Sequence, residues 1–231
     1  MSKLILVRHG QSFWNKERRF TGWADIDLTE QGKLEAKLAG VLIKKLDISI
    51  NAFFTSKLKR AIHTNEIILK VLNKSNSKVK KTDSLNERHY GGLTGLNKDE
   101  TIKKYGIKQV QIWRRSFDIA PPKMEINHPL KHKINSKILN ESLKDTYKRV
   151  IPFYDKNIKS LISSKKNVLI ILHGNSCRAL LMKILNISKK KIIRLEVPTG
   201  NPLLIKFNES LTISDFKYLD PKRAKKIFFN I

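Results

Sequence analysis

The sequence predicts an α/β fold in which a mostly parallel sheet is flanked by helices on both faces. Short apolar runs alternate with longer amphipathic stretches along the 231 residues, and this alternation is typical of parallel sheets. The run at residues 167–172 is almost continuously apolar, as expected for a central strand that is buried on both faces. We expect one catalytic domain over residues 1–231, with an irregular insertion around residues 86–140.

The N-terminal part begins with a strand predicted over Lys3–Val7, where most residues are apolar. A helix is predicted over residues 29–46, and Thr29 is of a type that caps helix N-termini. The apolar residues that recur in it at helical spacing are Leu34, Leu38, Val41 and Leu42.

A second strand is predicted over Asn51–Thr55, and a second helix runs from Ser56, as its cap, to about Leu72. Much of the buried face of this helix is assigned to Ala61, Ile62, Ile68 and Leu69. Residues 78–82 are interpreted as a further strand.

Beyond Leu85 the pattern indicates glycine-bearing loops and short helices as far as Ser116. Residues 118–140 contain several prolines and little periodicity, so they are expected to be irregular. The regular elements predicted after this stretch are a helix over 141–162, the strand over 167–172, a helix to about 185, and strands over 202–208 and 214–219.

The composition excludes several classes of protein. The single cysteine, Cys177, allows no intrachain disulfide and no cysteine-based metal site, and we expect it to be buried and structural. We find no secretion signal and no apolar run long enough to span a membrane, so a cytoplasmic location is expected.

The net charge of +27 raises nucleic-acid binding as an alternative. Because the lysines are dispersed and no basic–aromatic platform is visible, we favour solvated surface charge and no specific nucleic-acid or membrane partner.

Two of the predicted strands end in a histidine followed by a glycine. Arg8-His9-Gly10-Gln11-Ser12 follows the first strand, and His173-Gly174-Asn175-Ser176 follows the strand at 167–172. Ligands of parallel sheets bind beyond the carboxyl ends of the strands. His9 could therefore attack phosphorus while Arg8 grips phosphate oxygens and His173 donates a hydrogen bond to the phosphoryl group. One such tripeptide alone favours a structural histidine, whereas two together favour a function.

Further segments identify the family that the chain resembles. With the two histidine segments, they are Trp14-Asn15-Lys16, Arg19-Phe20-Thr21-Gly22-Trp23, Leu58-Lys59-Arg60-Ala61, Asn86-Glu87-Arg88-His89-Tyr90-Gly91, Gly95-Leu96-Asn97-Lys98, Tyr105-Gly106 and Trp113-Arg114-Arg115. The chain resembles the cofactor-dependent phosphoglycerate mutases of the histidine phosphatase superfamily, which implies their Rossmann-like phosphoglycerate mutase fold. The matching segments span about residues 3–219.

The resemblance implies interconversion of 2- and 3-phosphoglycerate, as in glycolysis and gluconeogenesis, through a phosphohistidine at His9. It implies that Arg8, Arg60 and His173 hold the transferred group and that Glu87 is the general acid/base. The residues implied to bind the rest of the small anionic substrate are Asn15, Thr21, Gly22, Tyr90, Lys98, Arg114, Arg115, Gly174 and Asn175. It also implies priming by 2,3-bisphosphoglycerate, no metal, and a homodimer or larger homo-oligomer.

The alternative is a phosphatase of the same superfamily that acts on small phosphate esters. It would share the histidines and arginines but would not need the segments around Lys98 and Arg114. By the resemblance, the stretch at 118–140 is shorter than its counterpart in typical bacterial members of the family. The apolar end Ile227–Ile231 is expected to dock. Both features bear on how the site excludes water, so some hydrolysis is expected beside transfer. The histidines at 63, 89, 128 and 132 are expected to be structural or exposed.

Overall fold

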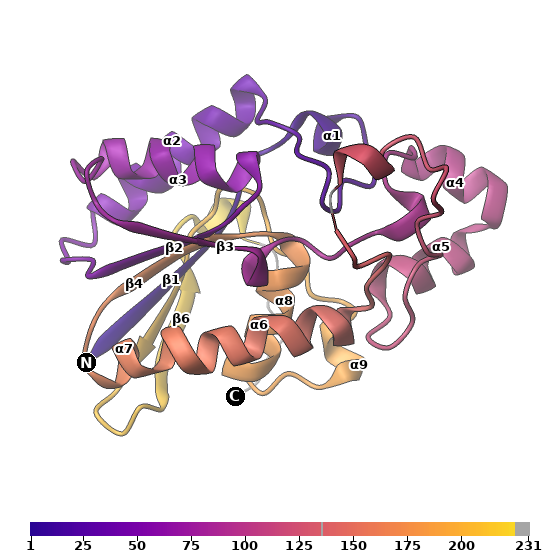
Figure 1. Cartoon of the computed structure of the whole chain (residues 1–231). Helices are drawn as coiled ribbons and strands as arrows, with labels where there is room; N and C mark the ends of the chain where they lie inside the picture. Colours follow the sequence, from indigo (N-terminus) through magenta and orange to yellow (C-terminus); the bar gives the residue numbers. More distant parts are fainter. Residues whose placement is uncertain (135, 225–231) are drawn as a thin grey trace.

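A six-stranded sheet lies at the centre of the computed structural model, which describes residues 1–134 and 136–224 (Figure 1). The strand order is β3-β2-β4-β1-β5-β6. The strands are β1 (Ser2–Arg8), β2 (Ala52–Ser56), β3 (Val79–Thr82), β4 (Val168–Leu172), β5 (Leu203–Phe207) and β6 (Ile213–Tyr218). The pairs β1–β4, β2–β4 and β2–β3 are parallel, whereas β5 is antiparallel to both β1 and β6. The predicted mostly parallel sheet is confirmed.

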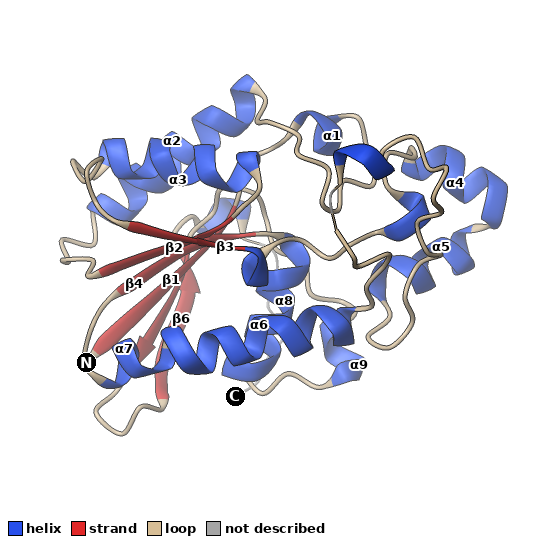
Figure 2. Ribbon diagram, in the orientation of Figure 1, coloured by secondary structure: helices blue, strands red, loops and turns tan. Residues whose placement is uncertain are grey.

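Helices cover both faces of this sheet, as Figure 2 shows. The α-helices among the described residues are α1 (Phe13–Lys16), α2 (Glu30–Lys44), α3 (Lys59–Val71), α4 (Lys98–Tyr105), α5 (Ile107–Arg115), α6 (Leu143–Asn157), α7 (Lys159–Ser163), α8 (Gly174–Ile184) and α9 (Lys189–Ile192). α2 and α3 lie on one face, and α6, α7 and α8 lie on the other. α1, α4 and α5 lie beyond one end of the sheet.

Alternate residues of the central strands serve the two faces, because successive side chains of a strand point in opposite directions. Ile5 and Val7 of β1 pack with Ile171 of β4 against α2 and α3. Leu4 and Leu6 of β1 pack against α6 and α8 instead. Since all five residues of β4 are fully buried, the continuous apolar run that predicted a central strand is explained.

α2 begins where the sequence predicts, but a different face of it is buried. The hydroxyl of Thr29 accepts a hydrogen bond from the Gly32 amide, which confirms the predicted N-cap. Leu34, by contrast, is 62% exposed, and the apolar residues at 38 and 41 are also exposed. The buried face consists of Gly32, Ala36, Ala39, Gly40 and Ile43. Small residues are needed there because α2 packs closely on α3: a Cβ at Gly40 would lie 2.8 Å from Cβ of Val71.

α3 begins two residues later than predicted, with Leu58 rather than Ser56 as its N-cap residue. Ser56 is therefore not the cap. It is the last residue of β2, and its hydroxyl hydrogen-bonds to His173. Of the residues assigned to the buried face, those at 61, 68 and 69 are buried, whereas Ile62 is half-buried.

The segment around 86–140 carries α4, α5 and long loops. In the predicted irregular stretch, the described residues form one short 3-10 helix, Lys131–Lys133. The single helix predicted over 141–162 is divided into α6 and α7. No helix among the described residues has the length and apolar character needed to cross a membrane. The tail at 227–231 lies outside the described residues.

Candidate active site

The two histidine segments lie side by side because they follow two adjacent parallel strands. Arg8 of β1 is in register with Leu172 of β4, and the His9 amide donates a hydrogen bond of 2.9 Å to the Leu172 carbonyl oxygen. The ring centroids of His9 and His173 are 4.9 Å apart, and the rings are tilted by 57°. Both side chains are buried. The parallel pairing of β1 with β4 is what brings the two imidazoles together.

Contacts around His9 determine which of its nitrogens carries the proton. Nδ1 lies 2.7 Å from the carbonyl oxygen of Gly10, which can only accept, so Nδ1 carries the proton. Nε2 accepts a hydrogen bond of 3.3 Å from Nε of Arg60. Burial, followed by the charges of Arg60 and Arg8, lowers the pKa of His9 well below its usual value. His9 is therefore neutral near pH 7, with its lone pair on Nε2.

His173 is held from behind by the end of β2. Its Nε2 lies 2.7 Å from the hydroxyl oxygen of Ser56, which also accepts a hydrogen bond from the Leu58 amide. The hydroxyl can donate to Nε2 or accept from it, so this contact fixes the position of the ring and not its tautomer. Nδ1 of His173 is buried without a hydrogen-bond partner among the described residues. Burial, then the charges of Arg60 and its other neighbours, lowers the pKa of His173, so this ring is also neutral.

Arg60 comes from the first turn of α3 and is 1% exposed. Its Nη1 donates to the carbonyl oxygen of Ala24 at 2.9 Å, and its Nη2 donates to that of Gly22 at 2.8 Å. Burial lowers its pKa to about 10, so the guanidinium keeps its charge at neutral pH. Arg8 is anchored by a 2.7 Å hydrogen bond from Nη1 to the Val197 carbonyl oxygen. Its buried Nε has no partner among the described residues.

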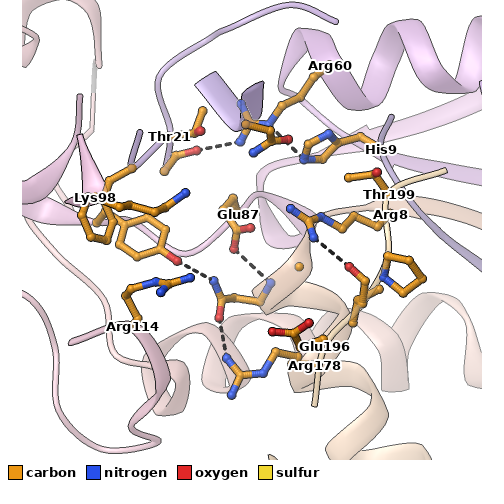
Figure 3. A pocket seen from close by; sticks show the side chains of 18 of the residues that line it. Arg8, His9, Thr21, Arg60, Glu87, Lys98, Arg114, Arg178, Glu196 and Thr199 are labelled. Atoms are coloured by element: carbon orange, nitrogen blue, oxygen red, sulfur yellow. Dashed lines mark hydrogen bonds between the residues drawn. The ribbon is translucent and has the colours of Figure 1, made fainter. Parts of the chain in front are cut away.

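A cavity of about 320 Å³ opens beyond the carboxyl ends of β1 and β4 (Figure 3). Seven cationic side chains and two carboxylates line it. The lining residues are Arg8, His9, Asn15, Arg19, Phe20, Thr21, Gly22, Arg60, Glu87, Tyr90, Lys98, Arg114, Arg115, Gly174, Asn175, Arg178, Leu195, Glu196, Val197, Pro198 and Thr199. Every site residue predicted from the sequence is among them except His173, whose ring lies 4.9 Å from that of His9, centroid to centroid. The excess of positive charge favours an anionic ligand.

Glu87 and the first turn of α8 face each other in this cavity (Figure 3). Glu87 is 8% exposed, and its Oε1 accepts hydrogen bonds from the amides of Arg88, at 2.7 Å, and Asn175, at 3.1 Å. A Cβ at Gly174 would lie 3.6 Å from Oε2 of Glu87 and 3.7 Å from the guanidinium of Arg8. The lack of a side chain at 174 therefore keeps the space between these two groups open.

A second group of cations lies farther from His9 and comes from α4 and α5. Asn97 caps α4, so Lys98 stands at the first position of that helix. Burial, partly offset by Tyr90, lowers the pKa of Lys98 to about 8. Although burial raises the pKa of Tyr90, the charge of Arg88 and other cations bring it down to about 8. Arg114 is half-buried in the last turn of α5.

Other predicted residues complete the wall between these two groups. Asn15 lies in α1, where its side chain closes a capping box with Ser12. The Thr21 hydroxyl is buried without a hydrogen-bond partner among the described residues. Gly22 has a φ of +52°, and a Cβ there would lie 3.0 Å from the Tyr90 amide nitrogen. Arg115 is committed to an ion pair of 2.9 Å with Glu196.

The cavity also contains residues to which the sequence analysis assigned no role. Arg178 lies one turn after Asn175 in α8 and donates a hydrogen bond of 2.8 Å to its side-chain oxygen. The i, i+3 spacing from Asn175 was the available signal. Arg19 and Phe20 lie within a segment that the resemblance uses. The loop at 195–199 carries no motif, and the Arg8–Val197 contact joins positions that are 189 residues apart.

The remaining histidines do not line the cavity. His89 is buried, and its Nδ1 accepts a hydrogen bond of 3.0 Å from the Gly91 amide. Burial, then the charge of Lys131, lowers its pKa to about 4. His63 pairs with Asp27 at 2.6 Å on a half-exposed surface. Across the described residues, no group of three or more histidine, cysteine, aspartate and glutamate side chains is arranged to hold a metal ion.

Comparison with known proteins agrees with this geometry. The family model of the histidine phosphatase superfamily (branch 1) matches residues 4–213. A 2,3-bisphosphoglycerate-dependent phosphoglycerate mutase from Pelagibacter ubique is 47% identical, covering 98% of this chain and 99% of that protein. The mutase of the same name from Hamiltonella defensa is 46% identical, covering 95% of this chain and 92% of that protein.

Solved structures show the same fold at lower sequence identity. The α-ribazole phosphatase from Shigella flexneri superimposes with a TM-score of 0.70 at 21% identity, covering 91% of this chain and 94% of that one. The phosphoserine phosphatase from Entamoeba histolytica, solved with 3-phosphoglyceric acid, gives a TM-score of 0.68 at 20% identity, covering 94% and 96%. From the family model and the full-length relatives, we conclude that the chain belongs to the histidine phosphatase superfamily, in the family of 2,3-bisphosphoglycerate-dependent phosphoglycerate mutases.

Proposed function

We propose that this protein interconverts 2-phosphoglycerate and 3-phosphoglycerate by way of a phosphorylated His9. The observation that carries the proposal is the neutral imidazole of His9, whose Nε2 lone pair lies beside the buried guanidinium of Arg60 in a strongly cationic cavity. The relatives of 46–47% identity that cover nearly the whole chain carry the name of this activity. In this reading His9 is the nucleophile.

In the transfer to His9, a bond forms between Nε2 and phosphorus as the bond from phosphorus to the substrate oxygen breaks. Arg8 and Arg60 neutralise charge on the phosphoryl oxygens. We propose that His173 carries its proton on Nδ1 and donates a hydrogen bond to the same group, because this nitrogen has no partner among the described residues. Glu87 in its acid form gives a proton to the departing oxygen. It takes a proton back from a substrate hydroxyl when the phosphoryl group returns.

A mutase must also hold the end of the substrate that does not react. We assign this task to the cations farther from His9, Lys98 and Arg114, and to the paired Arg115. The residues proposed to complete the binding surface are Asn15, Thr21, Gly22, Tyr90, Gly174 and Asn175. The proposed primer, 2,3-bisphosphoglycerate, supplies the first phosphoryl group, and the two separated groups of cations suit its two phosphates. We further propose a cytoplasmic, metal-independent enzyme that forms homo-oligomers.

A coupled assay for interconversion of the two phosphoglycerates, run with and without 2,3-bisphosphoglycerate, tests this function. We expect interconversion to depend on the bisphosphate and inorganic phosphate to appear more slowly than product. Release of phosphate without interconversion would establish a phosphatase instead. His9→Ala should abolish the base-stable, acid-labile phosphoenzyme, and His63→Ala, outside the cavity, is the control that should retain it.

A further inference from the structure

The carboxylate of Glu87 depends on a loop for its position. Glu87 follows the 3-10 helix Asp83–Leu85 and precedes the one at Gly91–Leu93, so no long helix or strand carries it. Catalytic groups must be held to within fractions of an ångström, and sites on loops are less exact than sites on helices and strands. Side chains from other elements must therefore hold this loop if the Glu87 carboxylate is to be placed accurately.

The guanidinium of Arg149, from the middle of α6, spans this loop. Nη1 donates to the carbonyl oxygens of Asp83, at 3.2 Å, and Ser84, at 2.9 Å. Nη2 donates to those of Asn86, at 3.0 Å, and Glu87, at 2.8 Å. One planar group thus holds four carbonyl oxygens within five consecutive residues. A lysine ammonium, with three donors on one nitrogen, cannot span the same distance.

Glu141 orients this guanidinium and holds the other side of the loop. Its Oε1 accepts from Nε of Arg149 at 2.6 Å, and its Oε2 accepts from Nη2 at 2.9 Å. The same Oε2 accepts from the His89 amide at 2.8 Å. The Glu141 side chain is only 3% exposed, so this bidentate pair is shielded from water. Trp23 adds a second donor to the Glu87 carbonyl oxygen and lies under the guanidinium.

Neither partner of this pair lines the cavity, so neither can touch the substrate. We propose that Arg149 and Glu141 are positioning residues that place the Glu87 carboxylate for proton transfer to the leaving oxygen. This inference rests on the proposed function, in which Glu87 is the general acid. Loss of a purely structural ion pair should slow the reaction with every phosphoryl donor. Loss of this pair should slow it only where the leaving group needs a proton.

Phosphoryl donors with different leaving groups test this claim. The rate of His9 phosphorylation is measured by rapid quench with 2,3-bisphosphoglycerate, whose leaving alkoxide needs a proton, and with 2,4-dinitrophenyl phosphate, whose leaving phenolate does not. For Arg149→Lys and Glu141→Gln we expect at least a tenfold loss with the bisphosphate and less than a threefold loss with the aryl phosphate. Glu87→Gln should show the same selectivity more strongly.

Lys144→Met is the matched control, because Lys144 lies on the same helix in an exposed pair with Asp118. It should leave both rates unchanged. Thermal unfolding monitored by circular dichroism identifies an assay temperature at which each variant is folded. If Arg149→Lys does not fold, Glu141→Gln alone tests the positioning role. Equal losses with both donors, or no loss with either, would overturn the positioning role. Absence of phosphohistidine in the wild type would refute the proposed function itself. No selectivity in Glu87→Gln would refute the role of Glu87 as general acid, and the positioning role with it.

Discussion

Removal of the Ser56 hydroxyl tests whether its contact with Nε2 orients the His173 ring. This hydroxyl lies 2.7 Å from Nε2 of His173 and 3.2 Å from the Leu58 amide nitrogen, and Ser56 is fully buried. Ser56→Ala leaves both groups without this partner. An orphaned buried polar group costs about 1–3 kcal/mol, so we expect a loss of at least about 2 kcal/mol for the two groups together. That corresponds to a fall of roughly 4–8 °C in Tm for a chain of this size.

The same change should reduce activity. His173 keeps its ring but loses the contact with the Ser56 hydroxyl that orients it, and a hydrogen bond of this kind contributes about 1 kcal/mol. We therefore expect kcat to fall by about fivefold, while KM changes little because the second group of cations is untouched. Urea unfolding and the coupled mutase assay measure the two effects separately.

The neighbouring Thr55 provides a matched control on the same strand. It is also fully buried, but its hydroxyl has no hydrogen-bond partner among the described residues. Thr55→Val preserves the shape and removes only this unpaired group, so the free energy of unfolding should stay the same or increase, with kcat unchanged. If Ser56→Ala behaves like Thr55→Val in both assays, the orienting contact with His173 does not matter and the reasoning fails.

Three further predictions concern pH, backbone packing and metal. The pKa of His89 falls from 6.5 to about 4 on folding, so the unfolded chain binds more protons below pH 6.5 and stability is lost as the pH falls. Between pH 8 and pH 5 the wild type should lose about 2 kcal/mol more than His89→Gln, and equal losses in urea titrations would contradict this. A Cβ at Gly32 would overlap the Gln11 carbonyl oxygen. Gly32→Ala should therefore lower kcat by displacing the loop after β1, whereas Ala36→Gly on the same helix should mainly lower Tm. Because seven cationic side chains line the cavity, EDTA should leave the mutase rate unchanged, and restoration of a lost rate by a divalent ion would refute this.

The sequence predicted the central part of the fold because local patterns determine it. β4 is buried on both faces, so its apolar run has no polar interruption. The two strand ends could be located together because both carry His-Gly and parallel strands end at one edge of the sheet. Most residues of the cavity were assigned through the family's motifs rather than through periodicity, and their roles remain proposals.

Three features could not be predicted from the sequence because they depend on tertiary contacts. The face of α2 that packs on α3 depends on how closely the two helices approach, so the larger Leu34 and Leu38 remain outside. Ser56 resembles a helix cap locally, yet its hydroxyl is used by a histidine 117 residues away. The carbonyl oxygens that Arg149 holds belong to the backbone and leave no trace in residue identity.

The position of β1 has a consequence for how the enzyme acquires its activity. β1 is made first, but the strands on its two sides, β4 and β5, come from residues 168–172 and 203–207. A nascent chain that exposes only the first half therefore contains His9, the proposed nucleophile, without the strands that anchor it. Pairing of strands that are so far apart in the sequence is slow, because the chain loses conformational entropy before the stabilising contacts form. His9 should therefore gain its folded environment late, when nearly all of these residues have left the ribosome.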